Sequence, residues 1–265
     1  MKGIILAGGT ATRLFPLTAT TSKQLLPVYD RQMIFYPLNT LIKAGINDFL
    51  IIVAPEQSGQ FLNLLGSLFK NHGVSIMFEV QKVPRGLADA FIVGETFIDG
   101  DNVTMILGDN IFEDDFSGYI NDFKSGAHIF AKKVLDPERY GVVKFDERGK
   151  VLQIVEKPGE FISDYAIPGL YIFDQRVCEA ARAVNPSERG EIEITSLHNH
   201  YLKLGELTVS TFEGEWLDAG TFDSLLEASR IVKEKELHKN FHSVINQAIA
   251  EFNEELKDIC KKRLL

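Results

Sequence analysis

The chain has 265 residues, of which 45% are hydrophobic and 25% charged, and its 37 acidic and 28 basic side chains leave a formal net charge of −9. This composition predicts a folded globular protein and excludes both a disordered chain and a disulfide-rich scaffold. The negative charge also excludes attraction of nucleic acid or of an anionic membrane by a global field, so we expect neither as a partner.

Two features favour a cytoplasmic protein. The cysteines Cys178 and Cys260 are far apart in the sequence and outside any Cys-x-x-Cys pair, which is typical of reduced thiols. The N-terminal run MKGIILAGG is too short for a secretory signal, and no segment approaches the roughly 18 apolar residues that a transmembrane helix needs.

The first half of the chain alternates apolar runs with segments of helical spacing. Residues 3–7 form an apolar run that leads into Gly8 and Gly9, which predicts a buried strand followed by a tight loop. Further strands are expected at 48–53, 74–80 and 103–107, and helices at 33–44, 57–70 and 86–95. This alternation predicts an α/β fold of Rossmann-like type, with a mostly parallel central sheet flanked by helices.

The second half is richer in short strands. They are expected at 128–132, 141–145, 151–155, 165–173 and 207–212, with a helix at 175–183 and helical structure from residue 222 to the end. The turn DERG predicts a hairpin of the second and third of these strands, and an apolar stripe runs from Val244 to Cys260. We expect one domain in three parts: 1–126, an inserted β region at 127–221, and a helical tail at 222–265.

The N-terminal segment is basic within an acidic chain. It has no Asp or Glu before Asp30, yet it contains Lys2, Arg13 and Lys23. The glycines of the sequence GGTATR at 8–13 allow backbone N–H groups to turn toward an oxyanion. The loop matches neither GxxxxGK[ST] nor GxGxxG, so a tight turn with ordinary surface cations is the alternative. Two cations beside the loop favour a polyphosphate ligand.

Single acidic residues follow two apolar runs. Asp109 follows VTMIL, and Asp218 stands in WLDAGT. At the carboxyl ends of strands, such acids either hold a metal or substrate or cap the next turn. Together they would suit Mg²⁺, which takes a few carboxylates plus substrate phosphates. Glu156 and Lys157 precede Pro158 at another strand end, where a solvated turn is the alternative. The six histidines form no recognisable site, and we interpret them as structural or exposed.

Nine segments, in collinear order from residue 1 to about 235, resemble the sugar nucleotidylyltransferases. They are GGTATRLFPLT at 8–18, SKQLLPVYDRQMIFYPL at 22–38, GLADAF at 86–91, LGDNIF at 107–112, ERYGVV at 138–143, VEKP at 155–158, GLYIFD at 169–174, RGEIEIT at 189–195 and WLDAGTFDSLLEAS at 216–229. The similarity is strongest to the members that use dTTP and glucose 1-phosphate.

The resemblance implies a role for each matching position. Gly8, Gly9, Thr10 and Thr12 would wrap the nucleotide, Arg13 and Lys23 would bind its triphosphate, Gln81 and Gly86 would read the pyrimidine, and Asp109 and Asp218 would hold Mg²⁺. Gln24, Asn110, Gly141, Glu156, Gly169 and Trp216 would line the nucleotide and sugar pockets, with Lys157 and Arg189 on the sugar phosphate. The resemblance also implies a nucleotide-binding part at 1–126, a sugar-phosphate-binding part at 127–221 and a homotetramer.

The chemistry of these residues suits the implied reaction, in which an oxygen of a sugar 1-phosphate attacks the nucleotide α-phosphorus. A phosphate monoester carries about −1.5 to −2 charge at pH 7, so it scarcely needs a general base. Positioning and charge neutralisation are then the main catalytic tasks. We assign these tasks to Arg13, Lys23, Asp109, Lys157 and Asp218.

Several departures from the family pattern leave alternatives open. Ala11 replaces a glycine, Arg31-Gln32 replaces Lys-Pro, Arg85 stands where an acid is usual, and Pro168 replaces a small polar residue. Use of UTP beside dTTP is one alternative, because a methyl-sized difference supplies only about 1–3 kcal/mol of discrimination. A nucleotide-sugar sensor without catalysis is another. A glycosyltransferase would need a DxD-type motif, and the acidic run at 113–115 is better explained as the solvated start of a helix.

Overall fold

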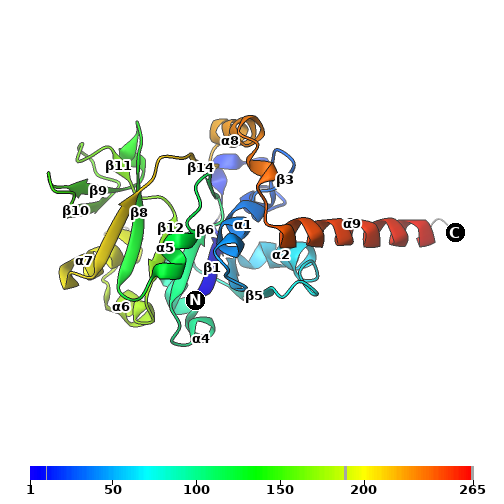
Figure 1. Cartoon of the computed structure of the whole chain (residues 1–265), viewed down its shortest axis with the longest axis horizontal. Coiled ribbons are helices and arrows are strands. Elements are labelled where there is room, and N and C mark those ends of the chain that lie inside the picture. The colour runs from blue at the N-terminus through cyan, green and yellow to red at the C-terminus, as the bar shows by residue number, and fades with distance from the viewer. Residues whose placement is uncertain (10, 188–189, 264–265) are drawn as a thin grey trace.

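The computed structural model describes residues 1–9, 11–187 and 190–263, without the side chains of 256 and 258–263. In this part of the chain, ten strands form one sheet in the order β10-β9-β11-β8-β12-β6-β1-β4-β5, with β13 paired to β8 beside this path. One end of the sheet is wholly parallel (Figure 1). It consists of β1 (Lys2–Ala7), β4 (Asp48–Val53), β5 (Ser75–Val80) and β6 (Val103–Leu107).

The other end of the sheet is mixed. Strand β12 runs antiparallel to both β6 and β8, whereas β13 runs parallel to β8. The strands here are β8 (Ala127–Lys133), β9 (Gly141–Phe145), β10 (Val151–Glu156), β11 (Tyr165–Ala166), β12 (Leu170–Phe173) and β13 (Leu207–Thr211). The predicted hairpin is confirmed, since β9 and β10 pair antiparallel across the predicted turn.

Helices cover both faces of the sheet, which explains why its central strands are apolar on both sides. Along β1, Ile5 packs with one core cluster and Ile4 with the other. The first cluster includes residues of α1 (Phe35–Lys43), α2 (Ser58–Leu65), α5 (Ser117–Asp122), α8 (Phe222–Glu234) and α9 (Ser243–Arg263). The second includes residues of α3 (Asp89–Val93), α4 (Glu95–Ile98), α6 (Val177–Ala183) and α7 (Ile194–Leu204).

Two small ribbons lie outside the main sheet. Strand β2 (Pro27–Val28) pairs with β3 (Arg31–Gln32), and β7 (Asn110–Phe112) pairs with β14 (Trp216–Asp218). Neither ribbon is predicted by the sequence pattern, because strands of two or three residues are too short to show a period. Helix α5 follows the helix start expected at 113–115, whereas α7 lies in a segment for which no element is predicted.

Four predicted elements differ from the structure. The helix expected at 86–95 is two short helices, α3 and α4, and the first begins only at Asp89, because Gly86 with φ +105° lies outside the helical region. The expected single strand at 165–173 is two strands, because Pro168 has no N–H for a ladder and the chain changes neighbours there, β11 pairing with β9 and β12 with β6. The helix expected at 57–70 ends at Leu65. The helical tail is interrupted between α8 and α9, where Glu236 adopts φ +55°.

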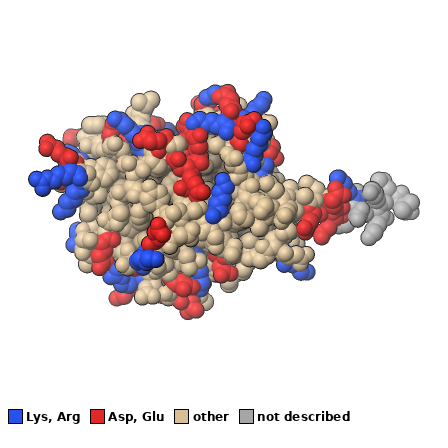
Figure 2. Space-filling model, in the orientation of Figure 1, with Lys and Arg blue, Asp and Glu red and all other residues tan. Residues whose placement is uncertain are grey.

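Helix α9 extends away from the rest of the molecule toward the C-terminus (Figure 1). Ile245 and Ala248 in its first turns are fully buried against the core. On the face shown in Figure 2, acidic and basic side chains are mixed along the upper rim and do not separate by sign. No helix in the described part of the chain is both long and apolar enough to cross a membrane.

Candidate active site

A cavity of about 680 Å³ lies at the carboxyl ends of the parallel strands. Its wall includes Leu6 and Gly8 at the end of β1 and Leu107 and Asp109 at the end of β6. Ligands of open α/β sheets bind at this edge, because the loops and helix starts that follow the strands converge there. The fold therefore places the predicted site where this class of sheet binds ligands.

The cavity gathers most residues that the sequence singled out. Among the predicted residues, those that line it are Gly8, Gly9, Arg13, Lys23, Gln24, Gln81, Gly86, Asp109, Asn110, Gly141, Glu156, Lys157, Gly169, Trp216 and Asp218. Thr12 begins a single 3-10 turn beside the cavity and does not line it. Thr10 and Arg189 lie outside the described residues.

The loop after β1 has a backbone conformation that favours glycine. Gly9 has φ +102°, and Ala11 has φ +45° in the left-handed region, where a β-carbon is strained. The Thr18 hydroxyl donates to the Ala11 carbonyl at 3.0 Å and helps to hold this conformation. The replacement of glycine by Ala11 therefore falls at a position with positive φ, so the strain considered from the sequence is present.

The β7–β14 ribbon brings the two predicted acids together from opposite halves of the chain. Its register places Asp218 opposite Asn110, the residue that follows Asp109. The Ala219 N–H also donates to the Asp109 carbonyl at 3.2 Å. The two carboxyls are therefore neighbours at one wall of the cavity, an arrangement that depends on the pairing of two three-residue strands.

These acids have opposite electrostatic environments. Burial opposes ionisation of Asp109, but the Lys23 ammonium, which donates to its Oδ2, keeps the pKa of that carboxyl below its ordinary value. For Asp218, burial and the neighbouring negative charge of Asp109 outweigh the attraction of Lys23 and Arg13 and raise the pKa to about 6. The pair thus has one carboxylate that is neutralised by a lysine and one that lacks enough positive charge around it.

The residues at this wall fit a divalent cation that is shared with substrate phosphates. Among the described residues, no group of three or more His, Cys, Asp or Glu side chains is placed to hold a metal, so a site enclosed by protein ligands is not built here. Mg²⁺ is commonly held by one or two carboxylates plus phosphates, and Asp109 and Asp218 supply that number. A cation would also relieve the repulsion that raises the Asp218 pKa.

Asn110 connects three elements around these acids. Its Oδ1 accepts from the Gly169 N–H at 2.9 Å and from the Trp216 Nε1–H at 2.7 Å, and its Nδ2 donates to Asp109 Oδ1 at 3.2 Å. The Trp216 ring also packs on Tyr140, with 4.8 Å between the ring centroids. Gly169 has no room for a side chain, because a β-carbon there would lie 2.5 Å from Leu107 Cγ.

The strands β9 and β10 supply the other wall. Glu156 Oε2 accepts from the Thr195 hydroxyl at 3.2 Å, and Lys157 Nζ lies 3.8 Å from Glu156 Oε1. Lys157 adopts φ +40° while its N–H donates to the Tyr140 carbonyl at 3.0 Å. A strained non-glycine residue held by its surroundings is a feature of ligand sites.

Several cavity residues were missed as individual candidates. They include Pro84, Leu87, Arg139, Tyr140, Ile167, Tyr171, Glu191, Glu193, Ile194 and Thr195. Eight of these stand in GLADAF, ERYGVV, GLYIFD or RGEIEIT, so those segments were the available signal, whereas Pro84 and Ile167 lie outside every quoted segment.

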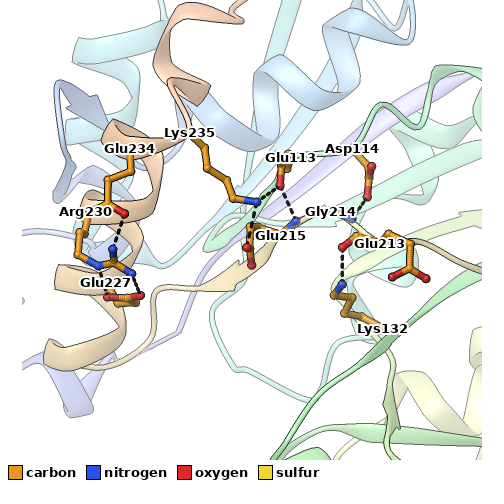
Figure 3. A network of polar contacts seen from close by, with 10 residues as sticks. All are labelled: Glu113, Asp114, Lys132, Glu213, Gly214, Glu215, Glu227, Arg230, Glu234 and Lys235. Carbon is orange, nitrogen blue, oxygen red and sulfur yellow. Dashed lines mark hydrogen bonds and ion pairs between the residues drawn. The ribbon is translucent and has the colours of Figure 1, made fainter.

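The far end of the β7–β14 ribbon is anchored by a network of charges (Figure 3). Glu113 Oε2 accepts from the Glu215 N–H at 2.9 Å, and Lys235 Nζ contacts Glu113 at 2.7 Å and Glu215 at 3.0 Å. Asp114 accepts from the Gly214 N–H at 2.7 Å. Asp115 accepts from the Ser117 N–H at 2.8 Å where α5 begins, so the acidic run at 113–115 has structural partners and includes the expected helix start.

The fold is that of the nucleotide-diphospho-sugar transferases. A crystal structure named as a glucose-1-phosphate thymidylyltransferase from Bacillus anthracis, with sucrose bound, superposes with a TM-score of 0.85, at 42% identity over 93% of this chain and 99% of that one. A UDP-glucose pyrophosphorylase structure has the same fold, with a TM-score of 0.77 at 23% identity over 88% of this chain and 98% of that one.

Residues 2–235 match the family described as Nucleotidyl transferase, and the chain belongs to that family. A protein of Neisseria meningitidis serogroup A named glucose-1-phosphate thymidylyltransferase is 47% identical over 97% of this chain and 91% of its own length. A protein of the same name from Mycolicibacterium smegmatis is 48% identical over 90% of this chain and 84% of its own length. The predicted family and fold class are both confirmed.

Proposed function

We propose that the protein joins dTTP and α-D-glucose 1-phosphate to make dTDP-glucose and pyrophosphate. The observation that carries the proposal is one cavity in which a basic glycine loop, a pair of carboxyls and a strained lysine face one another. The names and high identity of the relatives support the choice of dTTP and of glucose 1-phosphate among substrates of this class.

In this reaction an oxygen of the sugar phosphate forms a bond to the α-phosphorus of the nucleotide, and the bond from that phosphorus to the pyrophosphate oxygen breaks. Arg13 and Lys23 bind the triphosphate and disperse the charge that accumulates on the departing pyrophosphate. Lys157, on the opposite wall, binds the sugar phosphate and lowers the repulsion between the two anions. Arg189 is assigned to the same phosphate by the family resemblance.

Asp109 and Asp218 would hold Mg²⁺, which when bound neutralises phosphate charge and orients the triphosphate. Asn110 orients the Asp109 carboxyl for this role. The sugar and nucleotide pockets are lined by Gln24, Gly141, Glu156, Gly169 and Trp216, while Gly8 and Gly9 allow the backbone to approach the phosphates.

A cytoplasmic homotetramer is part of the same proposal. The family resemblance supports the homotetramer. The absence of a disulfide framework in the sequence supports the cytoplasmic location. Light scattering on the purified protein measures the assembly directly, and a mass four times that of one chain is the expected result.

The direct test is pyrophosphate release from the purified protein with glucose 1-phosphate and Mg²⁺, with dTTP and UTP assayed in parallel. Release with dTTP that EDTA abolishes is expected. Release with UTP at a comparable rate would replace the dTTP-specific enzyme by one of dual specificity. Binding of dTTP without any release would instead indicate a sensor.

Two variants test the roles of the cations. Arg13→Ala should lower kcat strongly, because it removes charge stabilisation at the triphosphate. Lys157→Ala should mainly raise the KM for glucose 1-phosphate. Wild-type kinetics in both variants would show that the two residues have been assigned wrongly.

A further inference from the structure

The end of the cavity beside β5 contains a three-residue polar contact around Gln81, the residue that the family resemblance assigns to the nucleotide base. Gln81 follows β5 directly and lines the cavity, and its Nε2 donates to Asp89 Oδ2 at 2.8 Å. The other oxygen of Asp89, Oδ1, accepts from Arg85 Nη2 at 2.8 Å. Asp89 is 1% exposed at the start of α3, whereas the Arg85 side chain is 57% exposed.

Asp89 determines which end of the Gln81 amide faces the cavity. A carboxylate accepts hydrogen bonds and cannot donate them, so Gln81 must direct its NH₂ group toward Asp89. The amide oxygen then points away from Asp89, and it lies 3.8 Å from the position of a β-carbon built on Gly8 in the loop after β1. Gln81 is thereby fixed as a hydrogen-bond acceptor on the cavity wall.

The neighbouring backbone presents a donor. Gly86 lines the same end of the cavity with φ +105°, and a β-carbon there would lie 2.4 Å from the Ile192 carbonyl oxygen. The hydrogen bonds from Ile192 N–H to the Arg85 carbonyl and from Ala88 N–H to the Ile192 carbonyl hold this segment. Within the described residues, the Gly86 N–H donates to no protein acceptor. An acceptor beside a donor complements a ring N–H beside a carbonyl, as in the imide of thymine or uracil.

We propose that Asp89, buried between Arg85 and Gln81, is a positioning residue that selects imide bases over cytosine by holding the Gln81 amide in one orientation. The inference rests on the proposed function, because it assigns a nucleotide base to this end of the cavity. Cytosine has a ring acceptor and an amino donor in place of the imide N–H and carbonyl. Its ring acceptor would therefore face the fixed acceptor oxygen of Gln81, and no hydrogen bond could form between them. Leaving such groups unpaired in a site is costly.

The test is calorimetric titration of dTTP and of dCTP into the protein without sugar phosphate. Asp89→Asn replaces the acceptor by an amide that can also donate, so Gln81 can rotate and accommodate cytosine. We expect the ratio of the dTTP and dCTP affinities to fall by about tenfold, the effect of one hydrogen bond of about 1.4 kcal/mol. An unchanged ratio in Asp89→Asn would overturn the proposal.

A double variant provides a rescue. When Gln81→Glu is combined with Asp89→Asn, the new amide at position 89 donates to one oxygen of the new carboxylate at position 81. The other oxygen of that carboxylate is then an obligatory acceptor in the cavity. This variant should regain most of the preference for dTTP.

The double variant also serves if Asp89→Asn alone does not fold. It is then compared with Gln81→Glu alone, in which two carboxylates are adjacent. Adding Asp89→Asn to Gln81→Glu should raise dTTP affinity, because it removes the repulsion between the two carboxylates and supplies a donor at position 89, which Asp89 lacks. No gain in affinity would contradict the proposal.

Asp174→Asn is the matched control. Asp174 is also a buried carboxylate beside an arginine, Arg176, but it does not line the cavity. The Asp174→Asn substitution should lower stability and leave the ratio of the dTTP and dCTP affinities unchanged. An equal fall of this ratio in Asp89→Asn and Asp174→Asn would assign the effect to general destabilisation. Pyrophosphate release is measured separately, so a protein that shows the expected ratios without release contradicts the proposed function and not this inference.

Discussion

At the scale of single residues, the Asp218 carboxyl is held where ionisation is unfavourable. Its pKa is raised from 3.8 to about 6, chiefly by burial and then by Asp109, so ionisation costs folding free energy as the pH rises from 3.8 to 6. Asp218→Asn should therefore raise the free energy of unfolding by about 1–3 kcal/mol at pH 7.5 in EDTA. The gain should disappear below pH 4, where the wild-type carboxyl is protonated in both states.

Urea denaturation of the two proteins at several pH values measures this difference. Asp122→Asn, at an exposed site at the end of α5, is the control and should stay within about 0.5 kcal/mol of the wild type. A loss of stability in Asp218→Asn at pH 7.5 would contradict the prediction, because it would show that the ionised Asp218 carboxylate stabilises the fold.

Ala11 supplies a second prediction at this scale. Its φ of +45° costs an alanine about 1–2 kcal/mol of folding free energy. Glycine avoids this strain but loses more chain entropy on folding, so the substitution recovers only part of the cost. Ala11→Gly should raise the free energy of unfolding by about 0.5–1 kcal/mol. Ala250→Gly on the exposed side of α9 should do the opposite and lower it by about 1 kcal/mol, and denaturation curves of both variants test the sign. A destabilised Ala11→Gly variant would mean that the loop is not strained.

At the scale of elements, the stability of the cavity wall depends on short strands that a buried amide connects. Asn110 is 3% exposed and accepts from two donors, Gly169 N–H and Trp216 Nε1–H. Asn110→Ala would leave both donors without a partner and should lower the free energy of unfolding by about 2–4 kcal/mol. Thermal or chemical denaturation measures this loss. Asn102→Ala, which removes one bond of 3.3 Å near the surface, should cost less than about 1 kcal/mol, and an equal loss in both would contradict the assigned role.

The elements themselves show what local pattern can predict. The strands Asp48–Val53, Val103–Leu107 and Gly141–Phe145 have the predicted bounds, because apolar runs between turn residues define their own ends. The ribbon of β7 and β14 was not predicted, because each strand acquires its structure from the other. The break at Pro168 was not predicted either, although Pro168 and Gly169 form a turn signal that the sequence shows.

At the scale of the whole molecule, His198 makes stability depend on pH. It lies on the side of α7 that faces strand β12, fully buried and stacked on Phe173, and within the described residues neither ring nitrogen has a hydrogen-bond partner. Burial lowers its pKa to about 3. A histidine that ionises in the unfolded chain near pH 6.5 but stays neutral when folded stabilises the unfolded state increasingly as the pH falls below 6.5.

The wild-type protein should therefore lose about 2 kcal/mol of unfolding free energy at pH 5 through this residue alone. His198→Leu should lose less between pH 7.5 and pH 5, and His200→Leu, at a partly exposed position on the same helix, should follow the wild type. Denaturation series at the two pH values make the comparison. Equal losses in wild type and His198→Leu would show that the ring is protonated, or hydrated, within the fold.

By itself, the sequence determined the apolar strands, the glycine loop, the basic character of the first 29 residues and the family resemblance, because each of these is local or is carried by residue identity. The tertiary structure decided which of these residues meet. Asp109 and Asp218 become neighbours through the register of β7 and β14, and Gln81 takes its orientation from Asp89 across the start of α3. The raised pKa of Asp218 follows from burial beside another carboxylate, and proximity and burial arise when distant segments pack together.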